Sequence, residues 1–119
     1  MKILVINGHP DKESYCQAIF QTIVETIDSN RHELKVISLN EEDFDPVLRY
    51  GYRKRMKEDS FILRSQELIQ WAEHFIFVYP IWWSSMPSLM KGWIDRVFTP
   101  GIAYSANDQG SFIWNYLRG

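Results

Sequence analysis

The chain has 119 residues, which is enough for one domain. Its formal net charge is −2 and apolar residues make up 45%, an ordinary globular balance that gives no sign of nucleic-acid binding or of an anionic membrane surface. Cys16 is the only cysteine, and the apolar run after Met1 is too short for a signal peptide or a membrane span. We expect one cytoplasmic domain, residues 1–119, with no membrane span and no metal site.

Two strands and a helix are predicted in the first third of the chain. The β-branched run at residues 3–6 predicts a buried strand, which the glycine at position 8 ends. A helix is expected to begin at Ser14, with Gln17 placed for a capping box. Residues 34–39 alternate in part between apolar and polar, which predicts a second strand nearer the edge of a sheet.

A second helix is expected from about Asp59 or Ser60, followed by a third strand at residues 75–79. This strand is wholly apolar, so we expect it to be buried on both faces, and Pro80 should end it. Strands that alternate with helical patterns predict βαβ units and a parallel sheet.

A third helix is expected after residue 84. Ser84 and Ser85 are candidate caps, and Pro87 suits a first helical turn, where its missing N–H is not needed. Apolar residues then recur at helical spacing, and the charged residues fall towards the opposite face. The apolar positions are Leu89, Met90, Trp93, Ile94 and Val97, and the charged ones are Lys91, Asp95 and Arg96.

The first loop, residues 8–14, joins a strand to the amino end of a helix. Such an end offers unpaired N–H groups and a positive dipole, which suit a phosphate. His9 and Ser14 could add hydrogen bonds, whereas Asp11 and Glu13 add opposing charge, and no glycine-rich phosphate motif is present. On these residues alone, a plain turn with a serine cap is the favoured interpretation.

The aromatic loop, residues 80–85, follows the third strand and contains Trp82 and Trp83. In open α/β sheets, ligands bind at the carboxyl ends of the strands, and flat side chains there suit a flat aromatic ligand. Tryptophan is equally common in protein cores, so a binding role and a core role stay open for this pair. Trp93 fits the apolar helix face and is assigned to the core.

Together these segments resemble the flavodoxin-like NAD(P)H:quinone oxidoreductase family, which includes the ancillary quinone reductases of bacterial potassium-efflux systems. The likeness is strongest in the aromatic loop and the helix after it. The segments that carry it are residues 3–10, 14, 44–46, 72–77, 79–83, 86–87, 91–98 and 101–104.

The resemblance implies an α/β fold, a flavodoxin-like three-layer sandwich with a parallel sheet in the order 2-1-3 for the strands present. It also implies FMN or FAD as cofactor, NAD(P)H as reductant and two-electron hydride transfer through the flavin to a quinone-like acceptor. A homodimer is expected, with possible peripheral association with a membrane transporter.

The resemblance also implies site residues. Those matching positions near the flavin phosphates are His9, Ser14, Tyr15 and Cys16, although many members have asparagine where this chain has Cys16. Those matching the wall of the flavin ring are Pro80, Ile81, Trp82, Trp83 and Ser84. Tyr104 matches an aromatic residue of the substrate pocket, which in some members comes from the partner subunit. No side chain is identified as a catalytic acid.

Family members usually continue beyond the length of this chain, with further strands and a second flavin-contacting loop. We therefore expect the C-terminal strands to be missing and the third strand to form an exposed apolar edge. The alternative to a flavoenzyme is a non-catalytic truncated paralogue or fragment that acts only as a binding module.

Overall fold

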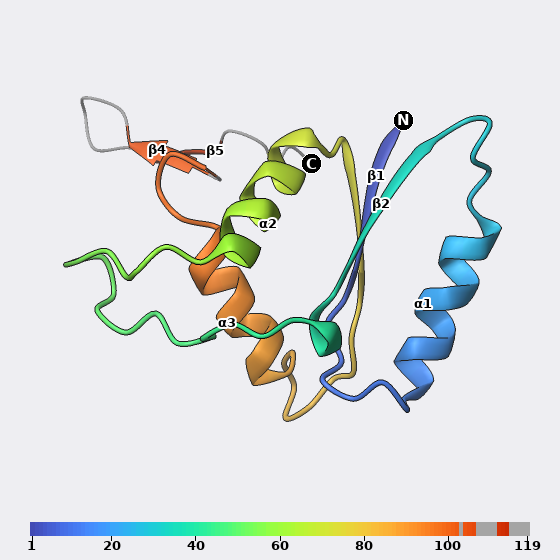
Figure 1. Ribbon diagram of the computed structural model, residues 1–119, viewed down its shortest axis with the longest axis horizontal. Coiled ribbons are helices and arrows are strands. Elements are labelled where there is room, and N and C mark those ends of the chain that lie inside the picture. The colour runs from blue at the N-terminus through green and yellow to red at the C-terminus, as the bar shows by residue number, and fades with distance from the viewer. Residues whose placement is uncertain (103, 107–111, 115–119) are drawn as a thin grey trace.

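The computed structural model describes the backbone of residues 1–102, 104–106 and 112–114, and the side chains of residues 1–102. Strands and helices alternate along most of this length (Figure 1). The elements are β1 (Lys2–Asn7), α1 (Tyr15–Thr26), β2 (Glu33–Ser38), the 3₁₀ turn η1 (Leu39–Glu41), α2 (Ser60–Trp71), β3 (His74–Val78), α3 (Ser88–Val97), β4 (Tyr104–Ala106) and β5 (Phe112–Trp114).

The main sheet is parallel and has the order β2-β1-β3, which confirms the predicted topology. Asn7, the last residue of β1, is paired with Ser38 of β2 on one side and with Val78 of β3 on the other. Helix α1 covers one face of this sheet, and α2 and α3 cover the other (Figure 1). This gives the expected three layers. Strands β4 and β5 form a separate antiparallel pair.

The central strand β1 supplies both halves of the core, because its side chains alternate between the two faces. Leu4 and Ile6 pack on the side of α2 and α3, around Trp93, while Val5 packs against α1. Trp93 is completely buried and its indole Nε1 donates to the Ser65 hydroxyl at 3.0 Å. The prediction that Trp93 belongs to the core is confirmed.

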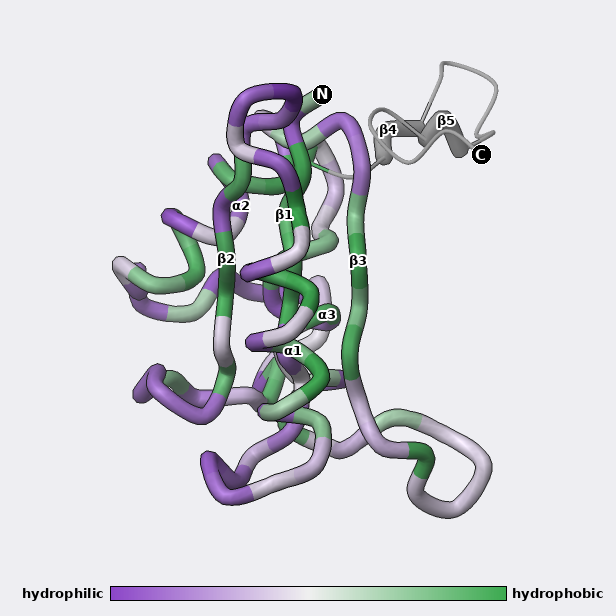
Figure 2. Tube along the Cα trace, turned by 90° about the vertical axis from the view of Figure 1, so that its right-hand side faces the viewer, coloured by the Kyte–Doolittle hydropathy of each residue, from purple (hydrophilic) through white to green (hydrophobic). Residues whose placement is uncertain are grey.

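Strand β3 is less buried than its sequence predicts. The expectation of burial on both faces is wrong, because Phe77 and Tyr79 are each 38% exposed. Within the described residues, β3 pairs with β1 alone, so its other edge carries no neighbouring strand. Figure 2 shows β3 as an outer, largely apolar strand. The predicted exposed apolar edge is therefore present in this part of the chain.

Helix α3 departs from the prediction in two respects. Pro87 is its N-cap residue and no side chain of the described residues caps it, so Ser84 and Ser85 do not have the predicted capping role. Arg96 was expected on the polar face but is only 7% exposed, and its guanidinium donates to the backbone carbonyl of Asp45. The connection between β2 and α2 covers α3 at Arg96 and buries it, whereas Lys91 and Asp95 of the same polar set stay accessible.

Candidate functional site

The first loop and the aromatic loop meet at the carboxyl edge of the sheet, where β1 and β3 end. The Gly8 N–H donates to the Val78 carbonyl at 2.8 Å. One residue further on, the ring of His9 lies edge-on to the Trp82 indole, with 5.4 Å between ring centroids and 79° between planes. Two segments far apart in the sequence thus form one continuous surface, as the sheet order predicts for a ligand site.

Gly8 allows the first loop to lie directly against α3. It is buried, and a Cβ at this position would stand 2.4 Å from the sulfur of Met90, itself 1% exposed. A side chain here would force either the Met90 side chain or the first loop to move. The small residue therefore holds the first loop close to the helix that follows the aromatic loop.

Local hydrogen bonds fix the path of the first loop. The Asp11 N–H donates to the His9 Nδ1 at 2.9 Å, and the Glu13 N–H donates to the Asp11 carboxylate at 3.0 Å. The Ser14 hydroxyl accepts from the Gln17 N–H at 3.1 Å, which confirms the predicted helix cap.

Four backbone N–H groups at the amino end of α1 have no partner within the described part of the chain, those of Lys12, Ser14, Tyr15 and Cys16. Lys12 lies in the first loop, and Ser14, Tyr15 and Cys16 are the N-cap and the first two residues of α1, at the positive end of the helix dipole. This is the arrangement that binds phosphate or carboxylate groups in many proteins.

The aromatic loop is built on a tight turn. Trp82 and Ser85 exchange two backbone hydrogen bonds, of 2.8 and 3.0 Å, across Trp83 and Ser84. Both central residues have positive φ, 51° and 60°, so the turn has the type I′ sign pattern in the absence of glycine. L-residues adopt this conformation at a cost, and such strain is concentrated at functional loops.

The turn presents its aromatic side chains outwards. Trp83 is fully exposed and Trp82 is 44% exposed, so neither tryptophan belongs to the core. Ile81 is 75% exposed and Pro80 is partly buried. Tyr79, which is 38% exposed, precedes this loop, and Met86, which is partly buried, follows it.

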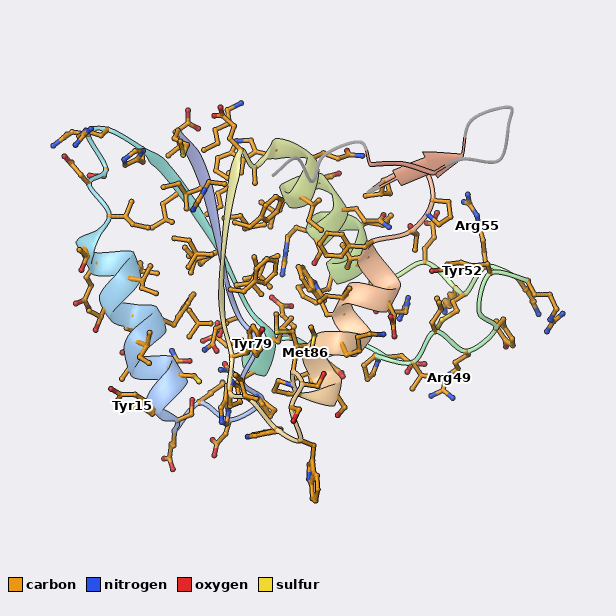
Figure 3. All side chains as sticks on the ribbon, turned by 180° about the vertical axis from the view of Figure 1, so that it is seen from behind. Tyr15, Arg49, Tyr52, Arg55, Tyr79 and Met86 are labelled. Carbon is orange, nitrogen blue, oxygen red and sulfur yellow. The ribbon has the colours of Figure 1, made fainter. Side chains whose placement is uncertain are left out.

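The remaining predicted site residues differ in how far their side chains are exposed. Ser14 and Cys16 are partly buried at the start of α1, whereas the Tyr15 side chain is 82% exposed and points away from the aromatic loop (Figure 3). Of Tyr15, only the backbone N–H is therefore a candidate contact for a phosphate. Tyr104 lies in β4, and its side chain falls outside the described residues.

Sequence reasoning missed two site residues, Asn7 and Asn40. Their amide groups both donate to the side-chain oxygen of Gln17, at 2.8 and 3.1 Å. Gln17 therefore accepts these two bonds, and no bond from its side chain back to Ser14 completes the predicted capping box. The available signal was position, since each asparagine directly follows the apolar run of a predicted strand.

The basic segment of residues 49–57 lies on the other side of the molecule. Figure 3 shows Arg49, Tyr52 and Arg55 on the long connection between β2 and α2, away from Tyr79 and Met86. Arg49 pairs with Asp45 at 2.5 Å, and this hydrogen bond holds the pKa of the Asp45 carboxyl below its usual 3.8. The segment takes no part in the site formed by the two loops.

Among the residues that the structure describes, no group of three histidine, cysteine or carboxylate side chains is placed to hold a metal ion. None of the described helices is long and apolar enough to cross a bilayer.

Comparison with known proteins identifies relatives over nearly the whole chain. A family model described as a flavodoxin-like fold matches residues 1–118. A ribosyldihydronicotinamide dehydrogenase-like protein of Penicillium crustosum is 29% identical, with 96% of this chain and 50% of the relative covered. The chain thus spans about half the length of the curated relatives that it matches.

Solved structures also match most of this chain and only part of their own length. A protein of Streptococcus mutans UA159 has 34% identity and a TM-score of 0.80, with 94% of this chain and 60% of that one covered. An NAD(P)H:quinone oxidoreductase from Methanothermobacter marburgensis has 27% identity and a TM-score of 0.74, with 88% and 57% covered.

An FMN-dependent NADH-azoreductase of Bacillus anthracis, solved in complex with FMN, has only 19% identity. Its TM-score is 0.67, with 97% of this chain and 63% of that one covered. This likeness shows the fold alone.

Proposed function

Because this chain belongs to the flavodoxin-like family of NAD(P)H:quinone oxidoreductases, we propose that it is a flavin-dependent oxidoreductase of this kind. In the proposal, FMN or FAD binds across the first loop and the aromatic loop. NAD(P)H is the reductant and a quinone-like molecule is the acceptor. Relatives named as quinone oxidoreductases support this reaction class.

The observation that carries the proposal is the contact between His9 and Trp82. It joins a set of unpaired backbone N–H groups to a set of exposed aromatic side chains at the carboxyl edge of the sheet. A flavin has a phosphate at one end and a flat ring at the other, so it matches both halves of this surface. If the first loop only capped α1, the exposed aromatic side chains beside it would have no role.

The phosphate end would be held by the first loop. The N–H groups of Lys12, Ser14, Tyr15 and Cys16 have no partner among the described residues, and the Ser14 hydroxyl, which accepts from the Gln17 N–H, retains its own proton as a donor. His9 accepts through Nδ1 from Asp11, which leaves its Nε2 as a donor in the neutral ring. Asp11 accepts from the Glu13 N–H, which engages part of the opposing charge within the loop.

The ring end would be held by the aromatic loop. The backbone N–H groups of Ile81, Trp83 and Ser84 have no partner among the described residues, and the Trp82 and Trp83 indoles are exposed beside them. When bound, the flavin supplies hydride transfer, accepting from NAD(P)H and donating to the acceptor. The protein's part is to orient the ring with the N–H groups and to exclude water from one face with an indole.

Assembly and location are further parts of the proposal. The family resemblance supports a cytoplasmic homodimer in which Tyr104 lies at the substrate pocket of a partner subunit. It also supports peripheral association with a membrane transporter. Sedimentation analysis of the purified chain, with and without added FMN, tests the dimer.

The central experiment is flavin binding followed by turnover. We expect the purified chain to quench the fluorescence of added FMN or FAD saturably, and to oxidise NAD(P)H when a benzoquinone is present. Trp82→Ala should weaken flavin binding, whereas Val36→Ala, at an exposed position on β2, should not. Absence of saturable quenching by either flavin would contradict the proposal and favour a binding role without chemistry.

A further inference from the structure

A single amide oxygen joins three elements beneath the first loop. The side-chain oxygen of Gln17, on α1, accepts from the Asn7 amide at 2.8 Å and from the Asn40 amide at 3.1 Å. Asn7 is the last residue of β1 and is completely buried, while Asn40 lies in the turn after β2. The ends of two strands and the start of the helix are therefore linked through one atom.

The same two asparagines hold the backbone of His9 on both sides. The His9 N–H donates to the Asn7 oxygen at 3.1 Å, and the His9 carbonyl accepts from the Asn40 amide at 3.4 Å. Ser38 steadies Asn40 by donating to its oxygen at 3.2 Å. The network therefore positions His9, whose ring contacts Trp82. The His9 Nδ1 in turn accepts from the Asp11 N–H, which extends the network along the loop.

A plain turn between a strand and a helix does not require this arrangement. Ser14 already caps α1, and an apolar residue at position 7 would avoid burying an amide, a group that is costly to leave without its hydrogen bonds. The hydrogen bonds of Asn7 and Asn40 instead fix the position of one loop residue, His9. Fixing binding groups before the ligand arrives raises affinity, because less order has to be imposed on binding.

We propose that Asn7, Gln17 and Asn40 form a positioning network that holds the first loop in the conformation that receives the phosphate of the cofactor. The inference rests on the proposed flavin site, and none of the three side chains is required to touch the cofactor. Loss of one amide should leave the fold intact and let the N–H groups of the first loop depart from the phosphate-binding geometry.

Two flavins that differ only in the phosphate separate this role from general stability. Asn40→Ala is the main variant, because Asn40 is only partly buried and lies outside the strands. We expect it to weaken FMN binding about tenfold, the equivalent of one hydrogen bond of about 1.4 kcal/mol, and to weaken riboflavin binding much less. Asn30→Ala, at an exposed asparagine outside the network, is the matched control and should change neither.

Gln17→Leu, which removes the shared acceptor, should act in the same direction and guards against an effect peculiar to one variant. Urea unfolding of each variant verifies that it is folded. Equal losses for FMN and riboflavin, or an unchanged FMN affinity in both variants, would overturn the positioning role.

Amide hydrogen exchange gives a second reading that needs no cofactor. The His9 N–H should exchange faster in Asn40→Ala and Gln17→Leu than in the wild type, while amides of α2 should keep their rates. If the wild type binds no flavin, the proposed function fails, but the exchange data still decide whether the network orders the loop. Unchanged exchange at His9 in both variants would contradict the inference.

Discussion

The ring of His9 stands edge-on to the indole of Trp82, 5.4 Å from centroid to centroid. Such edge-to-face pairs contribute about 0.5–1.5 kcal/mol beyond the area they bury. This contact connects the loop after β1 with the loop after β3, and a hydrogen bond from the Gly8 N–H to the Val78 carbonyl also joins the first loop to the end of β3. Substitution of either ring should therefore change the position of the other loop.

The two tryptophans Trp82 and Trp93 should respond to alanine substitution in different ways. Trp93→Ala should lower the free energy of unfolding by about 3–5 kcal/mol, because it empties a completely buried site and leaves the Ser65 hydroxyl without its donor. Trp82→Ala should cost far less stability, because its side chain is 44% exposed. Urea melts of both variants measure the difference, and equal losses would remove the distinction between core and site.

Ser14→Ala tests the phosphate end of the proposed site. Loss of the helix cap alone should cost about 1 kcal/mol of stability. If the Ser14 hydroxyl also donates to a phosphate, FMN affinity should fall by a larger factor than riboflavin affinity does. Fluorescence titration with both flavins measures this, and an unchanged FMN affinity would leave only the capping role.

Periodicity in the sequence was sufficient to predict the three layers. The continuous apolar run at residues 3–6 predicted the central strand, and helical spacing correctly placed Trp93 in the core. Arg96 could not be placed in this way, because its burial depends on the Asp45 carbonyl, which comes from a connection without regular structure. Periodicity describes one helix by itself and carries no information about an irregular segment that covers it.

The same limit of local patterns explains why only part of the site was predicted. Ser14 was found because capping is a local pattern, and the meeting of the two loops followed from the strand order. The convergence of Asn7 and Asn40 on Gln17 is a three-body contact between separate elements, which no local pattern contains. Sequence reasoning also failed for Ser84, because the tight turn at Trp82 uses this residue before the helix begins.

Two glycines are expected to tolerate alanine to different extents. A Cβ on Gly92 would lie 2.3 Å from the Pro46 carbonyl oxygen, which is backbone, whereas a Cβ on Gly8 would meet the flexible Met90 side chain. Gly92→Ala should therefore destabilise by about 1–3 kcal/mol or more, because packed backbone has to move. Gly8→Ala should cost less stability and should weaken flavin binding by shifting the first loop. Thermal melts and FMN titrations of both variants compare the two effects.

The ion pair of Asp45 and Arg49 should make a small, pH-dependent contribution to the stability of the folded chain. The hydrogen bond from Arg49 lowers the pKa of Asp45 in the folded chain below 3.8. A lowered folded pKa means that the stabilisation is present above the unfolded pKa and is lost as the pH falls through the folded one. Arg49→Gln should therefore raise the Asp45 titration midpoint measured by NMR, and its stability difference from the wild type should vanish in strong acid. A midpoint that does not move would show that the pair does not persist in solution.

The strained turn of the aromatic loop should accept glycine. Ser84 has a φ of 60°, a conformation that costs an L-residue about 1–2 kcal/mol, whereas glycine adopts it freely. The gain is offset by about 0.5–1 kcal/mol from the greater freedom of glycine in the unfolded chain. Ser84→Gly should therefore leave stability unchanged or raise it slightly, while Ser85→Gly, where φ is not positive, should lower it. Because the backbone N–H at position 84 is retained, flavin affinity should also be kept in Ser84→Gly, and a large loss of affinity would mean that the Ser84 side chain itself contacts the ligand.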